Sequence, residues 1–456
     1  MLTRRELLSR AGGGMGMLAL SSMLQSEGAA NSTNVHLPVN KAKSVIWLFM
    51  NGGPSGIDLF DPKPLLTKMD GKPFPGKIRT LFPYPGNIMK SPYEFRQYGE
   101  SGQFVSSVFP RLSKHVDEIT FLNACGSNEQ NHVPACYVVN TGRQQVGAPN
   151  VGSWATYGLA NEKRDLPEYV VMYDYRSAPE GGANLWSSGF LPAENQGTLF
   201  RSGKHPILHL KRPDGLSRST QEAQLELLNW LNERSIERYS GVQQLEARAK
   251  AFETAYKMQS SVPVLADLSS ETAATLDQYG INDPKCKYFG AQCLLARRMV
   301  EQEVPFIQIY HGGYENNWDQ HGDLVTGHAK NCYETDQPIA ALLADLKQRG
   351  LLDSTLVIWG GEFGRAPVSQ DKDGRDHNPY GFTMWMAGGG VKRGFRYGET
   401  DEFGYLPIQD SVSMPDLHAT VLHLMGIDEE RLTYQFGGRE QTATNGLGRV
   451  VHEIIS

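Results

Sequence analysis

The stretch Ser44-Val-Ile-Trp-Leu-Phe-Met-Asn-Gly-Gly-Pro-Ser-Gly56 decides the fold class. Its apolar run up to Met50 indicates a strand buried on both faces, and the glycine-rich run that follows indicates a loop at the carboxyl end of that strand. The same pattern recurs in Pro305–Gly313 and in Leu356–Arg365. Such strands predict a mainly parallel sheet that holds its ligands at the carboxyl ends of its strands.

Helical patterns lie between the predicted strands. One runs from Gln221 to Lys257 and the other from Tyr333 to Arg349, and both have apolar residues at helical spacing. The apolar side of the first pattern is formed by Leu225, Leu228, Trp230 and Leu231. Alternation of helices and strands predicts an α/β protein. We find neither an internal repeat nor an interdomain linker, so residues 40–456 are expected to form one domain with long insertions.

The composition excludes several classes of function. Of the 456 residues, 40% are hydrophobic and 21% are charged, which is typical of a packed globular protein. A formal net charge of -6 gives no basic surface for nucleic acid, so we expect no nucleic-acid partner. The five cysteines are scattered without paired short spacings, which indicates buried small side chains rather than a disulfide framework or a zinc ribbon.

The N-terminus carries a targeting signal. The run Thr-Arg-Arg-Glu-Leu-Leu-Ser-Arg at residues 3–10 precedes a weakly apolar stretch from Ala11 to Leu24 and the small residues Ala29 and Ala30. Residues 1–30 resemble a twin-arginine signal peptide, and a disordered basic tail explains the arginine pair less well. The apolar run is too short for a permanent membrane helix, so no stable span is expected after signal removal. We therefore expect export to the periplasm or cell envelope.

A cluster of acidic and imidazole side chains predicts a metal site. Asp319 and His321 stand two residues apart in a predicted loop, where both can face one cation, although a polar surface loop explains an isolated pair of this kind as well. Glu362 follows the strand that ends at residue 359, and Asp376 and His377 come shortly afterwards. Strand-end loops that all present such groups favour a site for a divalent metal, namely zinc, manganese or calcium.

Arginines and further acids accompany this cluster. Arg365 and Arg375 lie in the same loops and could bind a phosphate or sulfate through two oxygens, or could form structural ion pairs with Glu362 and Asp376. Asp58 is either a ligand or a capping acid.

Two further acids are weaker candidates. Asp61 is open to the same two interpretations as Asp58. In Asp416-Leu-His418 a helix N-cap explains the aspartate better than a ligand does. The sequence lacks a Gly-x-Ser-x-Gly elbow, a Walker loop and a dinucleotide-binding glycine pattern, so these hydrolase, nucleotide and nicotinamide functions are not expected.

Several motifs together resemble a known family. They match the domain of unknown function 1501, which is grouped with the alkaline phosphatase-like and sulfatase-like superfamily, over nearly the whole chain after the signal. The motifs are Gly52–Pro64, Asn140–Arg143, Gly152–Gly158, Trp318–His321, Gly361–Arg365 and Gly374–Pro379. The resemblance implies a three-layer α/β/α sandwich with a mainly parallel central sheet and long loop insertions.

The resemblance also implies ligand roles. Asp319 and His321 fall near the Asp and His ligands of one metal, and Glu362 replaces the Asp of an Asp-His pair. His377 falls near a later His ligand, and Asp58 is a possible substitute for an early aspartate.

The position of the nucleophile departs from the superfamily pattern. In sulfatases the nucleophile precedes the Thr-Gly-Arg signature by about nine residues, and counting back from Thr141 leads to His132. His132 is suited to be a metal ligand or a general acid. A metal-activated water could replace the covalent step.

Two functions follow as hypotheses. The first is an exported metal-dependent hydrolase of sulfate or phosphate esters, with a small-molecule or polysaccharide substrate. The second is a non-catalytic sulfatase-like protein that binds glycan or a partner at the cell envelope.

Overall fold

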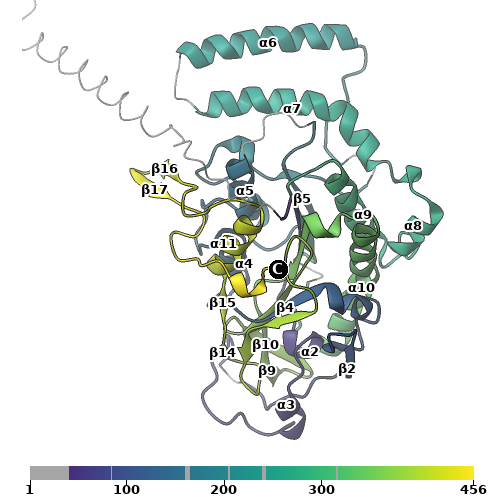
Figure 1. Cartoon of the computed structure of the whole chain (residues 1–456), viewed down its shortest axis with the longest axis vertical. Helices are drawn as coiled ribbons and strands as arrows, with labels where there is room; N and C mark the ends of the chain where they lie inside the picture. The colour runs from purple at the N-terminus through teal and green to yellow at the C-terminus, as the bar shows by residue number, and fades with distance from the viewer. Residues whose placement is uncertain (1–40, 84, 160–164, 204–205, 239–242, 315–316) are drawn as a thin grey trace, which may run out of the picture.

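The computed structural model describes residues 41–83, 85–159, 165–203, 206–238, 243–314 and 317–456 (Figure 1). The predicted signal peptide lies outside these residues. Within them, a nine-stranded sheet has the order β12-β4-β11-β8-β1-β7-β5-β6, with β15 paired to β4. Its strands are β1 (Ser44–Met50), β4 (Ile119–Gly126), β5 (Tyr169–Tyr173), β6 (Thr198–Leu199), β7 (Phe306–His311), β8 (Thr355–Gly360), β11 (Phe382–Ala387), β12 (Phe395–Tyr397) and β15 (Val412–Ser413).

The centre of the sheet is parallel. The three strands predicted from apolar runs are neighbours, because β1 pairs in parallel with β7 on one side and β8 on the other. Strand β5 continues the parallel pairing beyond β7, and β6 continues it beyond β5. Strand β11 runs antiparallel to both β8 and β4. The predicted α/β class with a mainly parallel sheet is confirmed.

Helices cover both faces of this sheet (Figure 1). All positions of β1 are buried, and its side chains alternate between two cores. Val45, Trp47 and Phe49 pack in the core that includes α4 (His132–Thr141), α5 (Val151–Leu159) and α11 (Met414–Leu424). The alternate side chains Ile46, Leu48 and Met50 pack in the core that includes α9 (Lys287–Glu301) and α10 (Leu324–Gln348). This two-sided burial gives the predicted α/β/α layers.

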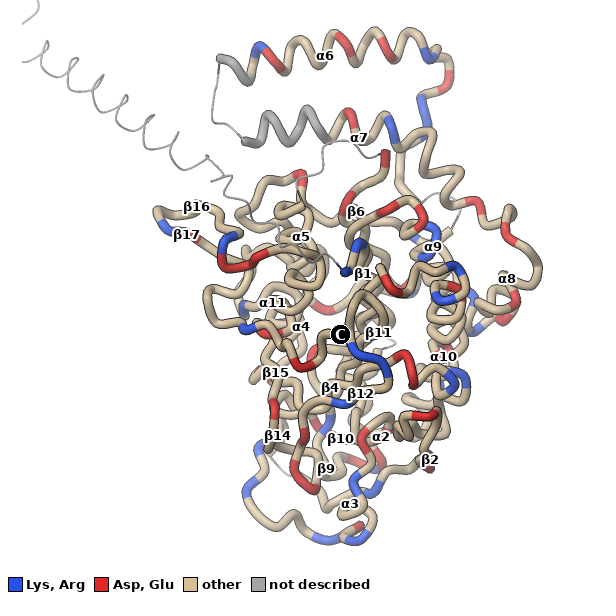
Figure 2. Tube along the Cα trace, in the orientation of Figure 1, with Lys and Arg blue, Asp and Glu red and all other residues tan. Residues whose placement is uncertain are grey.

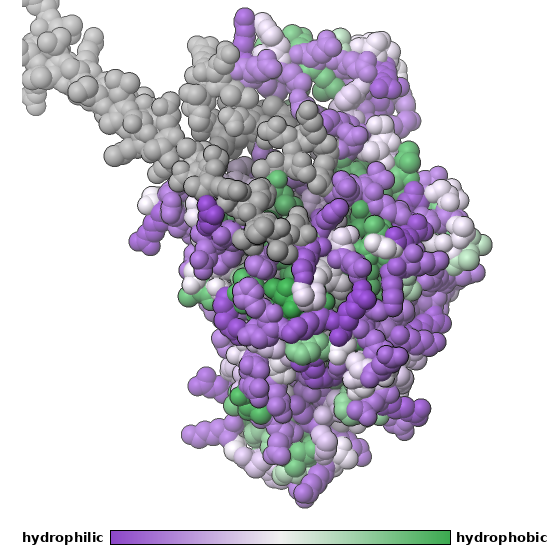
Figure 3. Space-filling model, viewed as in Figure 1, coloured by the Kyte–Doolittle hydropathy of each residue, from purple (hydrophilic) through white to green (hydrophobic). Residues whose placement is uncertain are grey.

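A helical hairpin projects from the body at the top of Figure 1. It consists of α6 (Arg218–Arg238) and α7 (Gln243–Ala266), so the prediction of one helix over 221–257 was wrong. A periodic apolar pattern does not reveal a chain reversal, since both helices continue it. Trp230 and Leu231, expected on a buried side, are each 47% exposed, and hydrophobic residues show over α6 in Figure 3.

Smaller elements complete the described chain. They are α2 (Gly56–Leu59), α3 (Pro64–Lys68), α8 (Ala273–Gln278), β2 (Phe95–Tyr98), β3 (Gln103–Ser106), β9 (Gly364–Gln370), β10 (Gly374–Asn378), β13 (Glu399–Thr400), β14 (Pro407–Gln409), β16 (Tyr434–Phe436) and β17 (Arg439–Gln441). All five cysteines are buried and free, as predicted. Among the described residues, none of the helices combines the length and the apolar character that a membrane span requires.

Candidate metal centre

The predicted site residues come from loops at one edge of the sheet. Because β11 is antiparallel to both of its neighbours, β4 points in the same direction as β8, β1 and β7. His132 begins α4 after β4, Asp319 and His321 lie in the loop after β7, and Glu362 follows β8. His377 lies on β10, in the β9–β10 hairpin that follows β8. Parallel strands thus bring together residues that are far apart in the sequence.

Two glycines allow these loops to approach each other. Gly52 has a φ of +111°, and a Cβ there would lie 2.5 Å from the backbone nitrogen of Trp318 and 2.6 Å from that of Asp319. A Cβ on Gly374 would lie 1.8 Å from the backbone carbon of His321. Any larger residue would therefore push the loop that carries Asp319 and His321 away from β1 or from β10.

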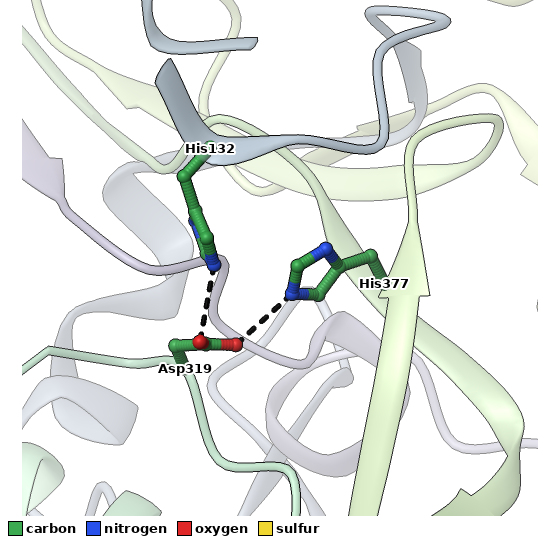
Figure 4. Close-up of side chains that lie close together, drawn as sticks. All are labelled: His132, Asp319 and His377. Atoms are coloured by element: carbon green, nitrogen blue, oxygen red, sulfur yellow. Dashed lines mark hydrogen bonds and ion pairs between the residues drawn. The ribbon is translucent and has the colours of Figure 1, made fainter. Parts of the chain in front are cut away.

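Asp319 lies at the centre of the cluster. Its Oδ1 atom is 2.8 Å from Nε2 of His321 and 3.0 Å from Nε2 of His377. Its Oδ2 atom is 3.1 Å from Nε2 of His132 (Figure 4). On the other side of the His132 ring, Nδ1 lies 2.6 Å from Oε1 of Glu362, whose side chain is fully buried. Five predicted residues therefore converge.

The histidine nitrogens in this cluster face one another as acceptors. Nδ1 of His377 is 2.6 Å from the carbonyl oxygen of Gln130, and Nδ1 of His321 is 2.5 Å from Oε1 of Gln370. Since an oxygen acceptor requires a donor, each Nδ1 carries a proton, and a neutral ring then keeps its lone pair on Nε2. The two Nε2 atoms are nevertheless only 3.0 Å apart and share Oδ1 of Asp319. Three acceptors that meet in this way favour a cation.

The electrostatics of the cluster also favour positive charge. Burial lowers the pKa of His377 to about 3, so its imidazole is neutral at pH 7. Burial would likewise lower the pKa of His132, but hydrogen bonds and charge interactions with Asp319 and Glu362 outweigh it and raise the pKa to about 10. Burial opposes ionisation of Asp319, yet the Arg365 guanidinium and the histidine hydrogen bonds hold its pKa well below the usual range.

The donor atoms fit a divalent metal. Ligand atoms of His132, Asp319 and His377 lie within 4.8 Å of one another, and the same holds for His321, Asp376 and His377. Nε2 of His132 is buried and lies 3.1 Å from Oδ2 of Asp319. Imidazole nitrogen combined with carboxylate oxygen is the donor set of zinc or manganese rather than of calcium, which takes oxygen ligands.

Comparison with known proteins identifies the family. The chain matches the family model described as protein of unknown function DUF1501 over residues 42–455. The chain belongs to this family. The predicted resemblance is confirmed, and the motifs in loops around the cluster are therefore motifs of a DUF1501 protein.

Solved structures similar to this DUF1501 protein include hydrolases. A sulfatase from Pseudoalteromonas sp. has 12% identity and a TM-score of 0.37, over 90% of this chain and 70% of that chain. The alkaline phosphatase of the Antarctic bacterium TAB5 has 10% identity and a TM-score of 0.36, over 85% and 99%. The lipoteichoic acid synthase of Listeria monocytogenes has 10% identity and a TM-score of 0.36, over 89% and 76%. At such values the likeness carries no inference about the site. No curated protein matches the chain.

The two predicted anion-binding arginines serve as internal supports in this DUF1501 protein. Arg365 is buried, and Nη2 lies 2.7 Å from Oδ1 of Asp319. Its other N–H groups donate to the carbonyl oxygens of Gly53 and Arg375. Because Arg365 is 1% exposed and its Nε, Nη1 and Nη2 atoms each contact a protein oxygen, the structure gives it a structural role in place of the predicted anion-binding one. The alternative prediction, an ion pair between Arg365 and Glu362, was also wrong, because Arg365 pairs with Asp319.

Arg375 and Asp58 form a buried ion pair. Nε and Nη2 of Arg375 lie 2.7 and 3.0 Å from the two oxygens of Asp58, and both side chains are fully buried. Asp58 also accepts a hydrogen bond from the hydroxyl of Ser55 at 2.5 Å. The roles predicted for Asp58 as a ligand and for Arg375 as an anion-binding residue are corrected, because each finds its charge partner in the other. Asp376, the alternative partner proposed for Arg375, is not that partner.

Asp376 and Asp61 both accept hydrogen bonds from neighbouring groups of the protein. Asp376 stays near the cluster, but its oxygens accept hydrogen bonds from the backbone N–H groups of His377 and Phe82 at 2.7 and 3.1 Å. Asp61 accepts a hydrogen bond from Thr400 and an ion pair from Lys63, in agreement with a structural role.

The pair Asp416 and His418 is structural, as predicted. Asp416 is the third residue of α11 in a capping box with Ser413, which is the actual N-cap. Nε2 of the buried His418 lies 2.8 Å from the carbonyl oxygen of Val139.

Sequence analysis missed the groups that orient the ligands and one further acid. Gln130 and Gln370 carry no sequence signal, because a neutral amide or a backbone carbonyl is common in loops. Glu180 is half-buried in the loop after β5. Burial and the charges of Glu362 and Asp319 raise the pKa of Glu180, whereas His132 lowers it, so this acid keeps its proton more readily than a free glutamate does.

Proposed function

We propose that this DUF1501 protein is an exported metal-dependent hydrolase that acts on sulfate or phosphate esters. The observation that carries the proposal is the convergence of the Nε2 lone pairs of His321 and His377 on Oδ1 of Asp319. A divalent cation between these acceptors would offset their repulsion, which the Arg365 guanidinium at 2.7 Å from Oδ1 offsets only in part. A polysaccharide ester or a small ester is the proposed substrate.

Four residues of the cluster would bind the metal, and Glu362 would orient one of these ligands. His132, Asp319, His321 and His377 would hold zinc or manganese, and their nitrogen and oxygen atoms suit these ions. A divalent cation in such a site supplies a Lewis acid for the ester oxygen and lowers the pKa of a bound water. Glu362 accepts from Nδ1 of His132 and so keeps Nε2 directed at Asp319.

A water nucleophile suits this arrangement better than a side-chain hydroxyl. The hydroxyl of Ser55 donates to Asp58, and that of Thr141 donates to the carbonyl oxygen of Tyr137 at 2.8 Å. With His132 at the expected nucleophile position and in contact with Asp319, we propose that a water oxygen forms the new bond to phosphorus or sulfur, that the bond from this atom to the ester oxygen breaks, and that the proton of the water passes to the leaving alkoxide.

Elemental mass spectrometry tests the metal. The mature protein, purified from a host with a working twin-arginine pathway, should contain stoichiometric zinc or manganese. His321→Ala and His377→Ala should lose it. His423→Ala, which changes a histidine of α11 outside the cluster, should retain it.

An ester screen then tests the reaction. Metal-loaded protein should hydrolyse sulfate or phosphate esters, and chelator should stop turnover. If the wild type stays empty after reconstitution with each metal, the hydrolase is ruled out and the glycan- or partner-binding function is favoured. If the protein holds metal but cleaves no ester, the proposed metal site stands and the proposed ester hydrolysis is ruled out.

Export rests on the arginine pair at residues 4 and 5. Replacing both with lysine should keep the protein in the cytoplasm, as measured by cell fractionation. Unchanged export would remove the twin-arginine route from the proposal.

A further inference from the structure

The segment between α3 and β2 brings an exposed aromatic ring to the edge of the cluster. The ring centroid of Phe82 lies 5.3 Å from that of His321, at an interplanar angle of 79°. The backbone N–H of Phe82 donates to Oδ2 of Asp376 at 3.1 Å. Phe82 nevertheless remains 45% exposed. A large apolar side chain therefore stands in solvent beside the candidate metal ligands.

Several hydrogen bonds fix this part of the chain. The hydroxyl of Tyr405 accepts from the backbone N–H of Arg79 at 2.9 Å and donates to the carbonyl oxygen of Arg79 at 3.1 Å. The hydroxyl of Thr80 donates to the carbonyl oxygen of Phe82 at 2.6 Å. With the bond to Asp376, these contacts hold the backbone on both sides of residue 81, so the ring of Phe82 is presented from an anchored backbone.

A second phenylalanine in the same segment shows what a structural role looks like. Phe74 is part of a small apolar cluster, with its ring centroid 4.9 Å from that of Phe403 and 6.1 Å from that of Tyr405. Phe82 instead meets a histidine of the cluster and water. Burial explains Phe74, whereas leaving an aromatic ring in water gives no stability from burial.

Apolar walls beside a few polar groups are typical of ligand sites. We propose that Phe82 is the surface on which the ring of the substrate packs, so that the ester group is directed at the cluster. The substrate is thus an anionic ester whose oxygen is attached to a sugar or aromatic ring. This inference rests on the proposed hydrolase function. The same segment carries the basic residues Lys77 and Arg79, and Figure 2 shows such residues in the chain beyond α3, where they would attract an anion.

Ligand binding to the metal-loaded protein tests this inference. Calorimetry would compare phenyl phosphate and glucose 6-phosphate with methyl phosphate, and the corresponding sulfates, in the wild type, Phe82→Ala, Phe82→Tyr and Leu81→Ala. Leu81 is the matched control, because it is the exposed neighbour in the same segment. Wild type should prefer ring-bearing esters, and the two ring types distinguish aryl from sugar substrates.

Phe82→Ala should lower the affinity for the ring-bearing esters by about fivefold, the scale of one aromatic contact. Its affinity for methyl esters and its metal content should not change, and Phe82→Tyr should restore the preference. Equal losses for both kinds of ester, or no loss, would overturn the role of Phe82 while leaving the hydrolase intact. A metal-loaded wild type that binds none of these esters would overturn both proposals together.

Discussion

Two buried groups of charged residues lie near each other in this protein and differ in one respect. Around Asp58, donors and acceptors match, because its oxygens receive the N–H groups of Arg375 and the hydroxyl of Ser55. Around Asp319, acceptors face acceptors, because the Nε2 atoms of His321 and His377 share one carboxylate oxygen. The first group is complete without a ligand, whereas the second offers acceptor atoms to a cation in addition to the Arg365 guanidinium that already contacts Asp319.

Burial and proximity do not by themselves distinguish a ligand-binding site from a structural ion pair. Both groups are held by strand-end loops and both contain acids and bases in close contact. What separates them is whether the polar atoms satisfy one another.

Asp319→Asn should abolish metal binding and ester hydrolysis. The substitution removes the negative charge at the meeting point of the three histidines, and even changes outside the ligand shell cost about 10–100-fold in metal affinity. Elemental analysis and turnover of the loaded protein measure the loss, which should exceed about 100-fold. Asp353→Asn, on an exposed aspartate, is the control. A variant that keeps full metal content would show that Asp319 is a partner of Arg365 only.

The sequence predicted the fold class and five of the converging residues, because both depend on where strands end. Apolar runs such as 44–50 identify buried strands, and the residues that follow parallel strands meet at one edge of the sheet. His132 was placed by the resemblance and Glu362 by its position after β8.

Pairing between distant residues could not be predicted. Whether Arg375 meets Asp58 or Asp376 depends on loop paths over hundreds of residues, and the composition of these loops does not encode them. The same applies to Gln130 and Gln370, since a carbonyl oxygen becomes an orienting group only when a histidine lies against it. Side-chain type and spacing indicate where chemistry can occur, and geometry decides which groups remain unsatisfied.

Arg375→Ala should destabilise the fold without changing the metal site. Breaking a fully buried pair leaves the carboxylate of Asp58 uncompensated, which costs about 3–5 kcal/mol of unfolding free energy. Urea unfolding measures it, and Lys211→Ala, in an exposed pair with Asp214, should change the unfolding free energy by less than about 1 kcal/mol. If Arg375→Ala were stable but bound anions poorly, the original anion-binding prediction would be restored.

Asp336 is a third kind of buried acid, and it should make stability depend on pH. It accepts backbone N–H groups from Arg111 and Leu112, but burial outweighs these bonds and raises its pKa from 3.8 to about 6. The folded state therefore binds the proton more tightly than the unfolded state. The resulting stabilisation is fully present below about pH 4 and is lost as the pH rises through about 6, by at most about 3 kcal/mol.

The difference between wild type and Asp336→Asn isolates this effect. Unfolding free energies measured from pH 4 to pH 7 should fall more steeply with pH in the wild type, because the amide does not titrate. Parallel curves would mean that the N–H groups from residues 111 and 112 compensate the burial, so that a carboxylate needs no charged partner here.

Gln370→Ala should weaken the metal site by about tenfold, the lower end of the range for groups outside the ligand shell. Its Oε1 atom accepts from Nδ1 of His321 and so fixes which nitrogen faces Asp319. Without it, the ring can protonate on Nε2 and donate to Asp319 in place of a cation. Metal titration measures the affinity, and Gln409→Ala in exposed β14 is the matched control. Unchanged affinity would mean that His321 does not depend on Gln370 for its protonation state. The difference between the Asp319 and Asp58 groups would then depend on His377 alone. Its Nδ1 atom contacts the backbone carbonyl of Gln130, which a side-chain substitution does not remove.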